Sequence, residues 1–225
     1  MGSVPTMSDP TTTTDDTDET QPAMPKHRFG IAALLATALL ALLVGVSVGF
    51  VAPQLTRPGD DSAEAGFLRD MSNHHAQAVE MAMIAFDGST VPDIKTLGND
   101  IALTQHGQVN IMKTWLREWG LNPTGTQPAM AWMPDAAGSV RDGLMPGMAT
   151  QQQMASLRAA TGKQLDVQFL ELMRQHHLGG IHMAQEIIEL SDNEDVTWIA
   201  GTMVATQQGE LNVISDLLIR VKAAP

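Results

Sequence analysis

Apolar residues recur at helical spacing through most of the chain after residue 62. From Phe67 to Ala85, the apolar and histidine positions advance by alternating steps of four and three residues, which places them on one face of a helix. Arg69, Asp70, Asn73, Gln77 and Glu80 fall on the opposite face, which we expect to be exposed. Similar patterns cover about 92–119, 163–190 and 196–222. No segment has the two-residue period of a strand, so the pattern predicts an all-α domain.

The first and third helical segments are copies of one another. FLRDMSNHHAQAVEMAMIA at Phe67–Ala85 returns 102 residues later as FLELMRQHHLGGIHMAQEI at Phe169–Ile187. TQHGQVNIM at Thr104–Met112 returns at the same offset as TQQGELNVI at Thr206–Ile214. Two copies at a fixed offset indicate an internally duplicated domain.

Short turns within each copy and a long connection between the copies predict the architecture. Neighbouring antiparallel helices need only short loops, so each copy is a helical hairpin. We predict an antiparallel, ferritin-like four-helix bundle with one long crossover. Its parts are repeat 1 (63–120), a Met-rich connection (121–162) and repeat 2 (163–222). Thr150 and Gln153 resemble a capping box for a short helix within the connection.

The N-terminal quarter has a different composition. Residues 1–28 are nearly free of apolar side chains and predict a disordered tail. The uncharged run 29–52 would reach ~36 Å as a helix, enough to span a bilayer. The basic cluster 26–28 predicts a cytoplasmic N-terminus and an extracytoplasmic C-terminal domain after a linker at 53–62. A cleaved signal peptide is the alternative, but the run is longer than its usual apolar segment.

Composition excludes several classes of function. With 25 acidic and 13 basic residues, the chain has a net charge of −12 and no basic stripe, so we expect no nucleic-acid partner and a surface that attracts cations. The absence of cysteine excludes disulfides and thiolate sites. No Ser/His/Asp set and no phosphate-binding glycine loop is present, so the chain is not predicted to be an enzyme. Methionine is abundant, with 15 residues against 5 Phe and no Tyr.

Methionine and histidine share the core-facing stripe of the two repeated helices. The eight positions are His74, His75, Met71, Met81, His176, His177, Met173 and Met183. Counting outward from the turns places His74 near Gln105 and Gln108, and His176 near Gln208 and Glu210. Two interpretations remain open. The imidazoles are buried and hydrogen-bonded to these side chains, or imidazole and thioether bind a metal with Gln108 and Glu210 in support.

The donor types indicate which metal would bind. Glu-x-x-His pairs, His-Glu-x-x-His and loops of alternating Asp are all missing, which argues against di-iron, catalytic zinc and hard-ion sites. Neutral, soft donors suit Cu(I) and, by analogy, Ag(I).

The connection supplies a second set of candidates, Met130, Met133, Met145 and Met148. Their Pro/Gly-rich context predicts solvent-accessible thioethers that capture Cu(I), or else adaptable hydrophobes that cover the bundle. His182 and Glu186 are interpreted as a surface pair rather than as ligands.

These motifs resemble those of the bacterial family called domain of unknown function 305. The resemblance rests on Phe67–Ala82, Gln105–Leu116, Met145–Met148 and Phe169–Ala184. It implies a ferritin-like helical fold and, from some Met-rich extracytoplasmic members, copper binding at the eight Met and His positions named above. Gln108 stands where repeat 2 carries Glu210, and Gly179-Gly180 replaces Gln77-Ala78, so we expect the two halves to bind unequally.

The resulting hypothesis is a single-pass membrane protein that binds Cu(I) outside the cytoplasm for storage, buffering or delivery, with an unidentified metallochaperone or membrane complex as partner. The alternative is a helical accessory subunit of a membrane complex that binds no metal. A redox enzyme with a metal in the bundle core is disfavoured by the missing carboxylates. Exposure distinguishes the first two, because ligands need access, whereas structural histidines are sealed and hydrogen-bonded.

Overall fold

The computed structural model describes residues 1–2, 30–55, 57–134 and 139–223, and the chain forms two units, 1–51 and 52–225. Helix α1 (Ile31–Leu55) contains an uncharged stretch, Ile31–Ala52, of mean hydropathy 2.6. By length and composition it is the one helix in the described parts of the chain that could cross a membrane. Almost all of the predicted N-terminal tail lies outside the described residues.

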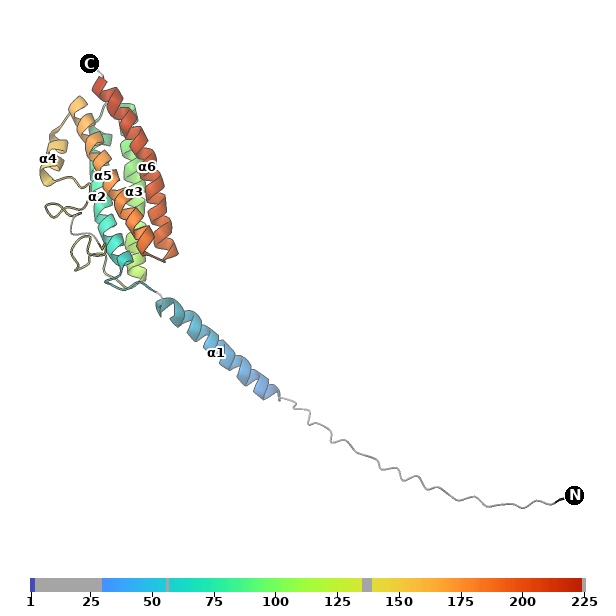
Figure 1. The fold of residues 1–225 in the computed structure, drawn as a ribbon. Helices are drawn as coiled ribbons and strands as arrows, with labels where there is room; N and C mark the ends of the chain where they lie inside the picture. The colour runs from blue at the N-terminus through green and yellow to red at the C-terminus, as the bar shows by residue number, and fades with distance from the viewer. Residues whose placement is uncertain (3–29, 56, 135–138, 224–225) are drawn as a thin grey trace. The chain divides into compact units, whose positions relative to one another are not determined.

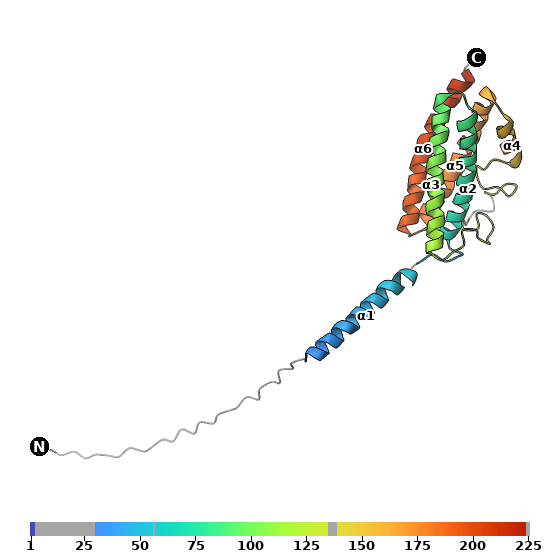
Figure 2. The same cartoon turned by 180° about the vertical axis from the view of Figure 1, so that it is seen from behind.

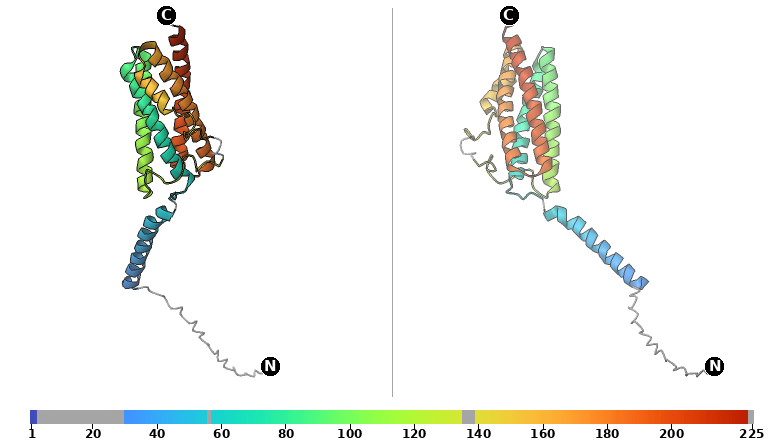
Figure 3. Two further views of the ribbon diagram at one scale, coloured as in Figure 1. Left: turned by 90° about the vertical axis from the view of Figure 1, so that its left-hand side faces the viewer. Right: turned by 45° about the vertical axis from the view of Figure 1, so that its right-hand side comes forward.

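The second unit consists of five helices. They are α2 (Ala63–Gly88), α3 (Pro92–Glu118), α4 (Gln151–Ala159), α5 (Gly162–Leu190) and α6 (Glu194–Ala223). The four long helices lie side by side (Figures 1 and 3) and form two antiparallel hairpins, α2–α3 and α5–α6. The all-α, four-helix prediction is therefore confirmed. An isolated bridge from Arg141 to Leu144 is the sole β-type pairing among the described residues.

Local sequence signals set the helix boundaries. Ser62 caps α2 by accepting a hydrogen bond from the Ala65 amide, and a proline occupies the first turn of α3. Thr150 and Gln153 form the predicted capping box of α4.

The connection and α4 lie on the α2 and α5 side of the bundle, away from α3 and α6, as the opposite views in Figures 1 and 2 show. Contacts between the hairpins run mainly through α2 and α5. These two helices carry the His-His motifs, so the repeated motifs meet at the centre of the domain.

The core consists of two apolar clusters. One gathers the C-terminal half of α2 and the N-terminal half of α5, from Ala78 and Leu165 onward. The other gathers the N-terminal half of α2 and the C-terminal half of α5, together with part of the connection. On each long helix a buried polar position separates the segment in one cluster from the segment in the other.

Candidate metal centre

Those separating positions form what we call the polar layer of the bundle. It consists of His74, His75, Gln105, His176, His177 and Gln207. All four histidines have 0% exposed surface, and the two glutamines have 2% and 3%. The rings of His74 and His176 lie 3.7 Å apart between centroids, so the first histidine of each motif contacts its counterpart in the other repeat.

Each imidazole of the polar layer is held through its Nε2 atom. His74 Nε2 donates to the carbonyl of Pro146 at 3.0 Å, and His176 Nε2 donates to the carbonyl of His74 at 2.9 Å. The second histidines instead reach the partner helix of their own hairpin, as the following pairs show: His75 with Gln108 Oε1 at 2.8 Å, and His177 with Glu210 Oε2 at 2.5 Å.

These partners correct the predicted register. Gln108 and Glu210 were expected opposite His74 and His176, but they pair with His75 and His177. One step along a helix turns a side chain by about 100°, so neighbouring histidines face different helices. His74 and His176 therefore lie between the hairpins, while His75 and His177 lie within them.

The hydrogen bonds also fix the tautomers. A carbonyl or carboxylate oxygen only accepts, so Nε2 carries a proton, and in a neutral ring Nδ1 then keeps a free lone pair. The Nδ1 atom of every histidine in the polar layer is buried without a hydrogen-bond partner, as are both amide atoms of Gln105 and Gln207. Elsewhere in the described residues, Asp166 Oδ1 alone shares this condition. Unpaired buried polar atoms cost about 1–3 kcal/mol each, so their concentration in one layer requires an explanation.

Burial favours the neutral form of three of these rings. Loss of hydration lowers the pKa of His74 to about 3 and that of His75 to about 4, with a smaller contribution from neighbouring histidines. Burial also lowers the pKa of His176 well below its usual value. Neutral rings with bare Nδ1 atoms are the form in which histidine binds a metal.

The four candidate methionines of these helices flank the polar layer in crossed pairs. Met81 and Met173 belong to one apolar cluster, and Met71 and Met183 belong to the other. All four have 0% exposed surface. Each cluster thus contains one methionine from each repeat. The two methionines of a single repeat therefore lie on opposite sides of the polar layer.

Among the described residues, no three His, Cys, Asp or Glu side chains come together as a metal-binding group. A metal in the polar layer would therefore need thioether or amide donors besides imidazole. Gln207 is one such neighbour, and it was not among the site residues predicted from the sequence. A Cβ atom on Gly180 would lie 2.7 Å from Gln207 Oε1 and 3.3 Å from His74 Cε1, which places this amide beside the ring.

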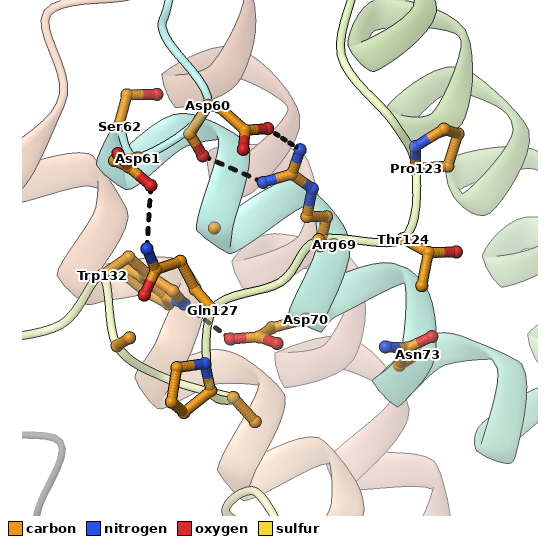
Figure 4. A pocket seen from close by; sticks show the side chains of 15 residues that line it. Asp60, Asp61, Ser62, Arg69, Asp70, Asn73, Pro123, Thr124, Gln127 and Trp132 are labelled. Carbon is orange, nitrogen blue, oxygen red and sulfur yellow. Dashed lines mark hydrogen bonds and ion pairs between the residues drawn. The ribbon is translucent and has the colours of Figure 1, made fainter.

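Part of the predicted exposed face of α2 is covered by the connection. Arg69 and Asp70 are 7% and 8% exposed and line a surface pocket (Figure 4). The Arg69 guanidinium donates to Asp60 and to the Asn122 carbonyl. Asp70 Oδ2 accepts from the Met130 amide at 2.6 Å and from Trp132 Nε1 at 2.9 Å.

Further along α2, Gln77 binds the other end of the connection. Its side-chain amide accepts from the Ala149 amide at 2.7 Å and donates to the Ala149 carbonyl at 2.9 Å. Three residues of the face predicted to be exposed, Arg69, Asp70 and Gln77, thus bind the connection, while Asn73 and Glu80 are exposed as expected.

The methionines of the connection also differ from the expectation of accessible thioethers. Met130, Met133 and Met145 are 0%, 5% and 6% exposed, and Met148 is half-buried. The first three pack into the apolar cluster of the α2 N-terminal half, and Met148 packs against it. The alternative interpretation, hydrophobes that cover the bundle, describes this packing.

A tight turn at Met145–Met148 reaches the polar layer directly. Pro146 and Gly147, with Gly147 at φ +79° and the Met148 amide bonded to the Met145 carbonyl, follow the pattern of a type II turn. A side chain on Gly147 would also lie 2.9 Å from His176 Cα, so glycine meets both the conformational and the steric requirement. The turn therefore rests on the backbone of α5 beside the histidine.

The fold and its paired His-His helices define the class of this domain: a four-helix domain built from two related helical hairpins. A family model, domain of unknown function 305 (DUF305), matches residues 64–218, and the chain belongs to this family. The predicted resemblance is confirmed. No match was found among curated proteins.

Solved structures share this fold. A DUF305 protein from Streptomyces coelicolor is 41% identical with a TM-score of 0.67, and the alignment covers 73% of this chain and 97% of the other. A DUF305 fragment from Deinococcus radiodurans is 30% identical with a TM-score of 0.58, covering 70% and 96%. CopM in its Cu(II)-bound form is 22% identical with a TM-score of 0.56, covering 71% and 97%, a likeness of fold alone.

Proposed function

We propose that this chain is a membrane-anchored, extracytoplasmic protein that binds Cu(I), and by the same chemistry Ag(I), for storage, buffering or delivery. It acts as a binding protein rather than as an enzyme. The observation that carries the proposal is the set of four buried imidazoles whose Nδ1 atoms have no hydrogen-bond partner.

The donor set fits the metal. Metal-binding histidines commonly donate their second ring N–H to a carbonyl or carboxylate, which fixes the ring and raises its basicity. His74, His176 and His177 each make such a bond through Nε2. Thioethers flank the layer on both sides. Neutral nitrogen and sulfur donors favour Cu(I) over hard cations.

The fold likeness to CopM supports the same class of cation, because CopM is described in Cu(II)-, Cu(I)- and silver-bound forms. At about 20% identity this support comes from the fold, and the residues of this chain carry the argument.

The anchor and its orientation belong to the proposal. Helix α1 is long and apolar enough to span a bilayer. The basic residues before it would keep the N-terminus cytoplasmic and place the His/Met domain outside, where copper is handled without competing thiols.

A second candidate function rests on one observation. The four histidines are sealed from solvent with every Nε2 bonded, which is the condition expected of structural histidines, since ligands would need access. In that case the domain is an accessory subunit of a membrane complex that binds no metal.

Titration of the full-length chain in detergent micelles with Cu(I), against a competing Cu(I) chelator, separates the two. We expect saturable Cu(I) binding, little Zn(II) binding, and at least a 100-fold loss of Cu(I) affinity in the double variant His74→Leu, His176→Leu. The matched control His106→Gln changes an exposed histidine and should leave affinity unchanged. Circular dichroism verifies that each variant is helical. Absence of saturable binding by the parent chain would favour the accessory-subunit function.

A further inference from the structure

The pocket of Figure 4 is a polar cavity at the end of the bundle where α2 begins. Its volume is about 360 Å³, within the range of about 300–1,000 Å³ typical of sites for small molecules. Its walls come from the turn before α2, the first half of α2 and the connection. Among the described residues that line it, there is no histidine or glutamine of the polar layer and no candidate methionine. Its chemistry is therefore separate from that of the proposed metal site.

Asp70 contributes a buried carboxylate to this pocket. The residue is 8% exposed, and its Oδ2 atom accepts hydrogen bonds from the Met130 amide and from Trp132 Nε1. Its Oδ1 atom makes no hydrogen bond among the described residues, and the side chain lines the pocket (Figure 4). Burial raises the pKa of Asp70, because loss of hydration disfavours the charged carboxylate. A cation in the pocket would favour the charged form.

The pocket also has an excess of negative charge. Arg69 is the single basic side chain among its described lining residues, and the guanidinium already binds the carboxylate and the carbonyl of Asp60. Asp61 accepts a hydrogen bond at 2.8 Å from the side-chain amide of Gln127, which is neutral. Two carboxylates, those of Asp61 and Asp70, therefore line the pocket without an ion pair in the described parts of the chain.

The neighbouring groups favour an organic cation over a metal ion. In the described residues, no three carboxylates or imidazoles come together as a metal-binding group, and this includes the aspartates of the pocket. An ammonium group has three N–H donors and needs separate acceptors for them. Asn73 and Thr124 offer a side-chain carbonyl and a hydroxyl that make no hydrogen bond within the described structure. Proline, alanine and tryptophan side chains complete the wall and suit methylene groups.

We infer that this pocket binds an aliphatic diamine or polyamine, with one ammonium group on Asp70 Oδ1 and a second on Asp61. Two positive charges match the two carboxylates that lack an ion pair, whereas a monoamine would match only one of them. The carbon chain between the ammonium groups would contact the apolar part of the wall, which includes Trp132. This function goes beyond the proposed metal binding and does not depend on it.

Isothermal titration calorimetry with 1,4-diaminobutane tests the inference on the metal-free, full-length chain in detergent micelles. We expect saturable binding of one diamine per chain, and no binding of 1,4-butanediol, which has the same length and no charge. Asp70→Asn keeps an acceptor oxygen for Met130 and Trp132 but removes the charge, so it should weaken binding about tenfold or more. Asp216→Asn, which changes an exposed carboxylate of α6, is the matched control and should leave the affinity unchanged.

A second variant tests the location without changing a residue that binds the connection. Asn73→Lys adds a covalently attached ammonium group to the wall of the pocket and should exclude the diamine. Asn110→Lys adds the same charge at an exposed position of α3 and should not. Circular dichroism verifies that each variant is helical.

Three results would overturn the inference. The first is a parent chain that shows no saturable binding, or that binds the diol as well as the diamine. The second is unchanged affinity in Asp70→Asn and Asn73→Lys. The third is binding of several diamines per chain that Asp70→Asn and Asp216→Asn weaken alike, which would indicate diffuse attraction to the acidic surface. None of them bears on the proposed function, because no metal is present.

Discussion

The two repeats agree in the polar layer and differ on the surface that meets the connection. The rings of His74 and His176 contact one another at the centre, tilted by 34°, and His75 and His177 each bind a polar partner 33 residues later. On the outer side, Asp70 and Gln77 of α2 bind the connection through side chains, whereas the positions 102 residues later carry Leu172 and Gly179.

This difference follows from the presence of a single connection. A duplicated hairpin has two equivalent outer surfaces, on α2 and α5. The single connection crosses both of them, so it meets each surface with a different part of its chain. Repeat 1 supplies polar side chains that bind its backbone, and repeat 2 supplies glycine, which lets its backbone approach α5. The residues that the two repeats share therefore form the polar layer, and the residues in which they differ form the surface that binds the connection.

The shared layer predicts the largest effect, a loss of stability in acid. Burial lowers the pKa of His74, His75 and His176 below their usual 6.5, so between those values the unfolded chain binds more protons than the folded chain. The contribution of these three rings to the free energy of unfolding is fully present above about pH 6.5. It falls as the pH decreases, by about 1.4 kcal/mol per pH unit for each ring. Urea unfolding of the metal-free chain measures the slope, with fluorescence of the four tryptophans, all in the bundle unit.

The exposed histidines supply the control for this slope. His106→Gln and His182→Gln should unfold with the same pH dependence as the parent chain, since neither side chain is buried. A free energy of unfolding that stays constant between about pH 7 and pH 5 would contradict the assignment of neutral, buried rings.

The difference between the repeats predicts an intermediate effect at Gly179. A Cβ atom there would overlap the Pro146 carbonyl and lie 2.8 Å from the Gly147 nitrogen. Gly179→Ala should therefore reduce the free energy of unfolding by about 1–3 kcal/mol. Gly209→Ala is the matched control on α6, because its Cβ would meet no atom within 4 Å. It should raise stability by about 0.5–1 kcal/mol, as alanine favours helix. Equal changes in both variants would mean that the connection does not press on α5.

The smallest predicted effect concerns the partners of the second histidines. Glu210 gives His177 a carboxylate acceptor, while Gln108 gives His75 a neutral amide. A carboxylate partner raises the basicity of a metal-binding imidazole, so Glu210→Gln should weaken Cu(I) binding about tenfold and Gln108→Glu should strengthen it. Chelator competition measures both. Unchanged affinity in both variants would indicate that His75 and His177 are not ligands.

Periodicity predicted the bundle because each long helix has a core-facing stripe that is mostly apolar, and the fixed 102-residue offset revealed the hairpins. Periodicity assigned the wrong partners to His74 and His176. Adjacent residues on a helix face different neighbours, and counting from a turn is not accurate to a single residue. It also assigned Arg69 and Asp70 to solvent. Their burial depends on where the connection folds, which has no repeating pattern. Gln207 was overlooked although it lies 102 residues after Gln105 in the repeat, because counting from the turn selected its neighbour Gln208.

The central claim is that the free Nδ1 lone pairs of the polar layer bind a soft cation. Nitrogen-15 NMR of histidine-labelled, full-length chain in micelles, recorded as Ag(I) is added, tests it atom by atom. We predict that Nδ1 resonances of the buried rings shift while their Nε2–H groups remain protonated and hydrogen-bonded. Unchanged Nδ1 resonances in the presence of excess Ag(I) would contradict the claim and identify the polar layer as a structural feature of the bundle.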